Sequence, residues 1–174
     1  DLILLDIMME PMDGWETLHN IKADQESKKI PVVMQTGKNL TYKEAEQFSF
    51  YIEDYIMKPI TPKRCVDIIN TILKKRQNVS EFIEKVRNDG YPEDQIERFV
   101  DLHRAIDVSD RLLKLLEDRY GSGPTDADPE SYGPEEFLEF RRRIISEYDA
   151  LQKKLAIRLW SSWIQVSSTG PLSE

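Results

Sequence analysis

The fold is decided by three stretches of sequence, LILLDIMMEPMDGW (2–15), PVVMQTGKN (31–39) and EDYIMKPI (53–60). Each begins as a short apolar run and then reaches a polar residue, Asp6, Thr36 or Lys58. Short apolar runs separated by helical segments are typical of buried parallel strands. The carboxyl ends of such strands meet at one edge of the sheet, where open α/β folds bind their ligands. The sequence therefore predicts that an acid, a hydroxyl and a lysine converge there as an anion site.

Helical segments separate these runs. Periodicity and capping predict helices over 15–23, 42–50 and 61–75. Thr41 followed by Glu44 has the spacing of a capping box. Thr61 precedes Pro62, and proline is favoured at the first position of a helix. Strands that alternate with helices indicate a parallel sheet with right-handed crossovers.

This pattern resembles the receiver domain of two-component response regulators. In that family a phosphoacceptor Asp ends the third strand, a Thr or Ser ends the fourth, and a Lys followed by Pro ends the fifth. The separations here are similar, with 30 residues from Asp6 to Thr36 and 22 from Thr36 to Lys58. Gly14 also falls where the family's acceptor loop has its glycine, although the proline of that loop is shifted by one place. The resemblance covers about residues 1–76 and implies a flavodoxin-like α/β fold in which strands 3-4-5 of the family are represented.

The resemblance implies a role for each polar residue. Asp6 would accept a phosphoryl group, Thr36 would hydrogen-bond a phosphoryl oxygen, and Lys58, whose bond to the next proline is expected to be cis, would pair with its charge. Tyr55 stands where receivers place a switch aromatic, and an ordinary half-buried strand tyrosine accounts for it equally well. Mg²⁺ is the implied cofactor, held by Asp6 and the backbone carbonyl of Met8. A sensor histidine kinase is the implied partner.

A receiver normally has two strands, a helix and an acidic Mg²⁺-binding pair ahead of its acceptor strand. This sequence begins five residues before Asp6. We expect the natural protein to include that missing portion. The alternative is a short chain that completes its sheet by swapping or dimerising. Without those preceding strands, the apolar run 2–5 would lie at a bare edge of the sheet.

Residues 77–174 are predicted to form a second module that is entirely helical. Helices are expected over 79–88, 92–119 and 134–164, with an acidic Gly/Pro-rich loop over 120–134. Apolar residues repeat at spacings of three and four along the last helix, at Phe137, Phe140, Ile144, Tyr148, Leu151, Leu155 and Leu159. Two long amphipathic helices joined by a loop predict an αα-hairpin. The heptad-like stripe, the acidic charge and Trp160 and Trp163 favour docking of an unknown protein target or a second copy of the chain. Core packing of a helical bundle is the simpler alternative.

Composition restricts the possible functions. Of the net charge of −8, −7 falls on residues 80–174, and an acidic half disfavours nucleic-acid binding. The triplet Arg141–Arg143 is expected to offset nearby glutamates on a solvated helix face. The single cysteine and the lack of an apolar run long enough to span a membrane favour a cytoplasmic location.

Two further functions stay open. The receiver could be degenerate and act as a constitutive scaffold. The helical module could also be a phosphotransfer domain that is phosphorylated on His103, but the glycine expected shortly after such a histidine is missing. This favours an ordinary histidine on a helix surface. In each case the chain is expected to be no enzyme beyond its own phosphoryl transfer and dephosphorylation.

Overall fold

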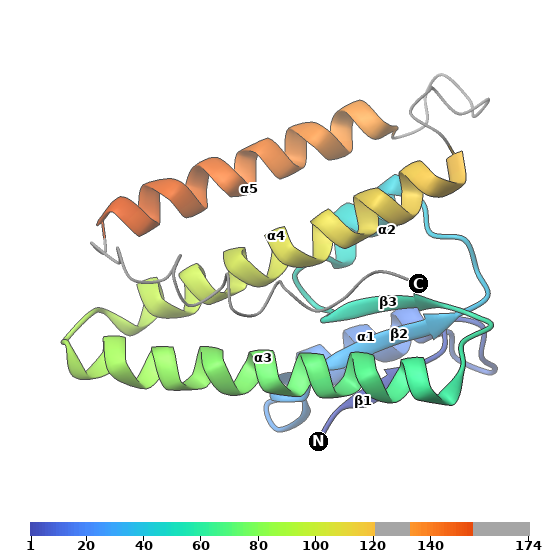
Figure 1. The fold of residues 1–174 in the computed structure, drawn as a ribbon, viewed down its shortest axis with the longest axis horizontal. Coiled ribbons are helices and arrows are strands. Elements are labelled where there is room, and N and C mark those ends of the chain that lie inside the picture. The colour runs from blue at the N-terminus through green and yellow to red at the C-terminus, as the bar shows by residue number, and fades with distance from the viewer. Residues whose placement is uncertain (121–132, 155–174) are drawn as a thin grey trace.

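A parallel sheet of three strands lies at one end of the molecule in the computed structural model, which describes residues 1–120 and 133–154 (Figure 1). The strands are β1 (Ile3–Leu5), β2 (Val32–Thr36) and β3 (Asp54–Met57). β2 is central and pairs with both neighbours, so β1 is an edge strand as predicted. Val32, Val33 and Met34 are all fully buried. Burial on both faces explains why the central strand reads as a continuous apolar run.

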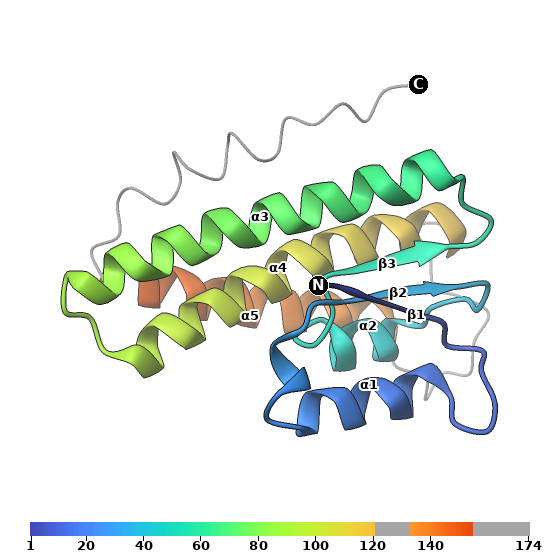
Figure 2. The same cartoon turned by 90° about the horizontal axis from the view of Figure 1, so that it is seen from below.

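Helices cover both faces of this sheet (Figure 2). One face carries α1 (Gly14–Ala23) and α2 (Tyr42–Phe48), and the other carries α3 (Pro62–Asn88), while a 3₁₀ turn, η1 (Ser27–Lys29), leads into β2. The Thr41–Glu44 capping box forms as predicted, and the Thr61 side chain caps α3. The predicted α/β arrangement with a parallel sheet is therefore confirmed.

Helix α3 corrects one prediction, because it is a single helix of 27 residues where two helices, 61–75 and 79–88, were expected. The polar stretch after Leu73 suggested a break. In the structure, Lys75 and Arg76 occupy the inward face between Ile72 and Val79, and they pair with charged groups on other elements. The inward-facing side of α3 therefore continues through these two polar residues. The predicted domain boundary after residue 76 falls inside this helix.

The remaining helices are α4 (Glu93–Tyr120) and α5 (Pro134–Lys154), which pack against each other as the predicted hairpin. α4 lies between α3 and α5 and also contacts β3 (Figure 1). Phe137, Phe140 and Ile144 of the predicted stripe are buried. The outer part of that stripe, Leu155 and Leu159, lies outside the described residues.

One hydrophobic core joins the sheet to the hairpin. Leu18 and Met34 from the α/β part belong to the same buried cluster as Leu102, Leu112 and Phe137 from α4 and α5. A second cluster lies farther along the helices and is centred on Val86, Ile96 and Phe99. The hairpin is therefore packed onto the sheet end of the molecule through shared apolar contacts.

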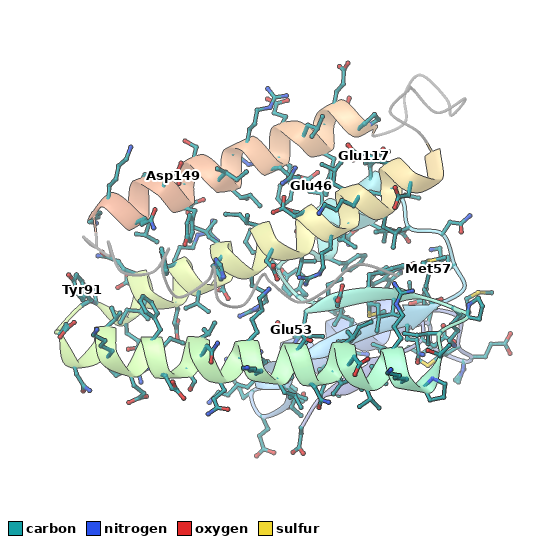
Figure 3. The ribbon with its side chains drawn as sticks, in the orientation of Figure 1. Glu46, Glu53, Met57, Tyr91, Glu117 and Asp149 are labelled. Carbon is teal, nitrogen blue, oxygen red and sulfur yellow. The ribbon has the colours of Figure 1, made fainter. Side chains whose placement is uncertain are left out.

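Charged side chains reinforce the same junction. Glu53 lies just before β3, beside α3 (Figure 3), and its carboxylate pairs with Arg76 at 2.7 Å and with Arg104 at 3.5 Å. Arg111 donates to the Glu53 carbonyl at 2.5 Å and pairs with Asp54 at 3.1 Å. Three arginines from α3 and α4 thus converge on the two acids that precede and begin β3.

His103 corrects a second prediction. It was expected on a helix surface, but it is half-buried on α4 and its ring lies 5.9 Å from that of Tyr148 on α5. His103 follows the buried Phe99 by four residues, so it shares the face that packs on α5. Burial lowers the pKa of His103 to about 4.

The arginine triplet on α5 also differs from expectation. Arg141 pairs with Asp110 of α4, and Arg143 lies 3.4 Å from Glu46 of α2. The glutamates along α5 were the expected partners. Two of the three arginines instead hold α5 to neighbouring helices, which the spacing of charges within a single helix does not indicate.

Candidate functional site

Asp6, Thr36 and Lys58 converge at the carboxyl edge of the sheet, as the sequence predicted. Asp6 follows the last residue of β1, Thr36 ends β2, and Lys58 follows β3. The Lys58 Nζ lies 2.5 Å from Asp6 Oδ2 although 52 residues separate them. The Lys58 backbone N–H donates to the Thr36 carbonyl at 2.9 Å, and the Lys58–Pro59 bond is cis, as expected.

The loop after Asp6 folds tightly around the carboxylate. The Met8 N–H donates to Asp6 Oδ1 at 3.1 Å, and the Gly14 N–H donates to the Ile7 carbonyl at 3.0 Å. A Cβ at Gly14 would lie only 2.2 Å from the Asp6 carbonyl oxygen. Only glycine permits this close approach, so Gly14 is needed to bring the start of α1 against the site.

The site favours an ionised Asp6. The hydrogen bond from Lys58 lowers the pKa of Asp6 most strongly; burial acts in the opposite direction, and the Met8 N–H and the Thr36 hydroxyl add to the lowering. The Asp6 side chain is still 29% exposed. The result is an accessible carboxylate with a fixed cation beside it, which suits a nucleophile that meets a negatively charged reactant.

Thr36 and Tyr55 are both connected to the loop that follows β2. Thr36 is fully buried, and its hydroxyl accepts a hydrogen bond from the Lys38 N–H at 3.2 Å. The Tyr55 ring is buried, and its hydroxyl donates to the Lys38 carbonyl at 2.7 Å. Thr36 and Tyr55 therefore bind the backbone N–H and the backbone carbonyl of the same residue, Lys38.

Sequence reasoning missed a cluster beside the site. Glu44 was predicted only as a capping residue of α2, yet its Oε1 accepts from the Trp15 indole N–H at 3.0 Å and from Lys38 Nζ at 2.7 Å. The Trp15 ring also stacks on Phe48 with centroids 3.8 Å apart. The position of Trp15 directly after Gly14 was the one sequence signal that places it near the site. Its partner Glu44 lies 29 residues away, so their contact leaves no local sequence pattern.

The family model for the response regulator receiver domain matches residues 1–70. These residues form a response regulator receiver domain. The match includes β1, β2 and β3, and therefore every residue of the predicted site.

Known proteins similar to this receiver include "Transcriptional regulatory protein ResD" of Bacillus subtilis, which is 35% identical over 47% of this chain and 33% of its own length. "Heme response regulator HssR" of Staphylococcus haemolyticus is 31% identical over 67% of this chain and 50% of its own. The chain spans between about a quarter and a half of the length of the first curated relatives that it matches.

A solved structure is also similar, the N-terminal domain of a response regulator receiver protein from Methanoculleus marisnigri. It is 56% identical to this receiver and covers 42% of this chain and 59% of that one, with a TM-score of 0.33.

Receiver domains bind Mg²⁺, and the residues at this edge of the sheet include the oxygen groups that bind this cation. Mg²⁺ takes hard oxygen ligands, often one or two carboxylates with several waters. The Asp6 carboxylate and the exposed Met8 segment supply an acid and a backbone carbonyl. Within residues 1–120 and 133–154, no three acids, histidines or cysteines gather closely enough to hold a metal by themselves. In the same described ranges, no helix is long and apolar enough to cross a membrane.

Proposed function

We propose that this receiver accepts a phosphoryl group on Asp6 from a sensor histidine kinase. The observation that carries the proposal is the Asp6–Lys58 contact of 2.5 Å beside the hydroxyl-bearing Thr36. An Asp6 carboxylate oxygen attacks phosphorus, the bond from phosphorus to the donor nitrogen breaks, and the donor imidazole keeps the electron pair. Lys58 and Thr36 then hold the new phosphoryl oxygens through a charge contact and a hydrogen bond.

Mg²⁺ is the proposed cofactor, and its ligands from these residues are the Asp6 carboxylate and the Met8 carbonyl. When bound, the cation screens charge repulsion between the carboxylate and the incoming phosphoryl group. The lowered pKa of Asp6 supports its part in this chemistry, because the nucleophile is already ionised at neutral pH.

Tyr55 is proposed as the switch aromatic. Its hydroxyl holds the Lys38 carbonyl, and the Lys38 N–H is held by the Thr36 hydroxyl. When the Thr36 hydroxyl turns to a phosphoryl oxygen, the Lys38 backbone loses one of these two hydrogen bonds. The Tyr55 side chain then gains freedom to change its contacts.

We assign the output to the helical part of the chain, with the receiver as residues 1–76 and the helical module as residues 77–174. The module is proposed to bind a protein target or a second copy of the chain through its helices, in the cytoplasm, without nucleic acid. Relatives such as ResD and HssR bear regulator names, which favours signalling over an enzymatic role. A degenerate receiver that acts as a constitutive scaffold is the alternative.

Phosphoryl acceptance is tested by intact mass after incubation with acetyl phosphate and Mg²⁺. The natural protein should gain about 80 Da. Asp6→Ala should abolish the gain, whereas Glu10→Gln, an exposed acid in the same loop, should retain it. A gain that persists in Asp6→Ala would place the acceptor elsewhere. If neither the natural protein nor Glu10→Gln gains mass, the constitutive scaffold becomes the better account.

A further inference from the structure

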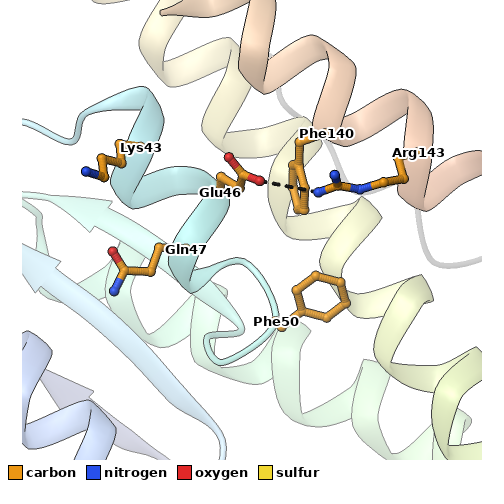
Figure 4. A pocket seen from close by; sticks show the side chains of 6 residues that line it. All are labelled: Lys43, Glu46, Gln47, Phe50, Phe140 and Arg143. Atoms are coloured by element: carbon orange, nitrogen blue, oxygen red, sulfur yellow. Dashed lines mark hydrogen bonds and ion pairs between the residues drawn. The ribbon is translucent and has the colours of Figure 1, made fainter. Parts of the chain in front are cut away.

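A surface hollow of about 450 Å³ lies between α2 and α5, lined by Lys43, Glu46, Gln47, Phe50, Phe140 and Arg143 (Figure 4). Arg143 pairs with Glu46 at 3.4 Å, and its guanidinium lies 5.7 Å from the centre of the Phe140 ring. That ring meets the Phe50 ring edge-on at 6.2 Å. The charged and aromatic groups of this hollow are therefore largely engaged with one another.

The loop between β1 and α1 carries a different exposed feature, three methionine side chains. Met8 is 69% exposed, and Met9 and Met12 are each 37% exposed. The chain has five methionines. The other two lie in strands of the sheet, where Met34 is fully buried and Met57 is half-buried. The exposed methionines of this protein therefore all lie in the loop that follows the acceptor carboxylate.

Hydrogen bonds connect this loop to the acceptor and to α1. Met8 follows Asp6 by two residues, and its N–H donates to Asp6 Oδ1 at 3.1 Å. The thioether sulfur of Met12 accepts a hydrogen bond from Asn20 Nδ2 at 3.3 Å, which ties the loop to α1. A chemical change at the sulfur atoms of this loop therefore alters the surroundings of Asp6.

Exposed thioethers react with peroxides to give methionine sulfoxide. A sulfur lone pair attacks one peroxide oxygen, and the O–O bond breaks. The proton on the bound oxygen passes to the departing hydroxide, which leaves as water. Sulfur loses two electrons and peroxide gains them. A flexible apolar side chain thus becomes a polar one that carries a hydrogen-bond acceptor.

We propose that the three methionines of this loop form a peroxide-sensitive modification site, and that their oxidation slows phosphoryl acceptance on Asp6. The slowing rests on the proposed function of Asp6, whereas the selective oxidation of the loop does not. Each new sulfoxide oxygen bears partial negative charge. It competes with the Asp6 carboxylate for the Lys58 ammonium, whose side chain is 43% exposed, and it repels the anionic phosphoryl donor.

Peptide mass spectrometry of the full chain after treatment with hydrogen peroxide tests the site. Each sulfoxide adds about 16 Da. The peptide that contains residues 8–12 should gain oxygen before the peptides that contain Met34 and Met57. Earlier oxidation of Met34 or Met57 would overturn the proposed site. Cys65 is replaced by serine in every protein compared, because a free thiol also reacts with peroxide.

The rate of mass gain from acetyl phosphate and Mg²⁺, measured after the peroxide is removed, tests the consequence. Oxidation should slow the gain about fivefold, the effect of one hydrogen bond of ordinary strength. Methionine sulfoxide reductases with a dithiol should restore the rate. The combined variant Met8→Leu, Met9→Leu and Met12→Leu should keep its own untreated rate after peroxide. Met57→Leu, the matched control outside the loop, should still be slowed.

Full oxidation of the loop without a change in rate would overturn the effect on acceptance. Slowing that persists in the combined leucine variant would assign the effect to another group and contradict the proposal. Slowing that the reductases do not reverse has the same meaning, and it decides the matter even if the leucine variant folds poorly. If the untreated protein gains no mass, the proposed function of Asp6 fails and the slowing falls with it, while the order of methionine oxidation still tests the site.

Discussion

At the scale of a single residue, His103 makes stability depend on pH. Burial between α4 and α5 lowers its pKa from 6.5 to about 4; Asp107 acts to raise the pKa, while Lys75 and Arg104 act to lower it. Between these two pKa values the unfolded chain binds a proton that the folded chain does not, so stability falls as pH decreases. The contribution of His103 to stability is therefore fully present above the pKa of the unfolded state, 6.5, and is lost as the pH falls toward 4.

We predict that the free energy of unfolding contributed by His103 falls by about 2 kcal/mol between pH 7 and pH 5. Chemical denaturation at the two pH values measures it. His103→Gln cannot titrate, so this variant should show a smaller fall. His19→Gln, which changes an exposed histidine on α1, should behave like the unchanged protein. An identical fall in all three proteins would assign the pH dependence to other groups.

Individual site residues were predictable from sequence where strand position fixed their location. Asp6, Thr36 and Lys58 each stand where a strand ends, and parallel pairing leaves one place for them to meet. Glu44 and Trp15 were not predictable as a pair, because their contact depends on how α1 and α2 pack rather than on spacing along the chain.

At the scale of elements, α3 shows where periodicity misleads. Apolar spacing is interrupted at Lys75 and Arg76, so the sequence predicted an end at that point. Their partners, Asp107 and Glu53, lie on other elements and supply the inward contacts that apolar residues supply elsewhere. Strands and caps were predicted because their signals are local. The continuity of α3 was not predicted, because it depends on charges more than 20 residues away.

Because α3 is one continuous helix, we predict that a break at its middle strongly lowers the free energy of unfolding. Gln77→Pro removes a backbone hydrogen bond and should lower the free energy of unfolding by about 3 kcal/mol. Gln77→Ala leaves the helix intact and should change stability little, as both side chains favour helix. Urea denaturation of the two variants measures the difference. Equal stabilities would indicate that residues near position 77 act as a linker.

At the scale of the whole molecule, the shared core implies that the receiver and the described hairpin unfold together. Leu18 and Met34 belong to the same buried cluster as Phe137 of α5, and Arg111 links α4 to the start of β3. Loss of the hairpin would expose apolar surface of the receiver to water, at about 25 cal/mol for each Å². Separate transitions are therefore disfavoured.

We predict one unfolding transition with coincident midpoints for two probes, α-helical circular dichroism and fluorescence of Trp15 in a background where Trp160 and Trp163 are phenylalanine. Phe137→Ala, which truncates a fully buried ring on α5, should destabilise by about 3–5 kcal/mol and shift both probes equally. Leu138→Ala changes its 36% exposed neighbour and should have a much smaller effect. If Phe137→Ala shifted the helical signal while Trp15 kept its midpoint, the hairpin would be a separate folding unit.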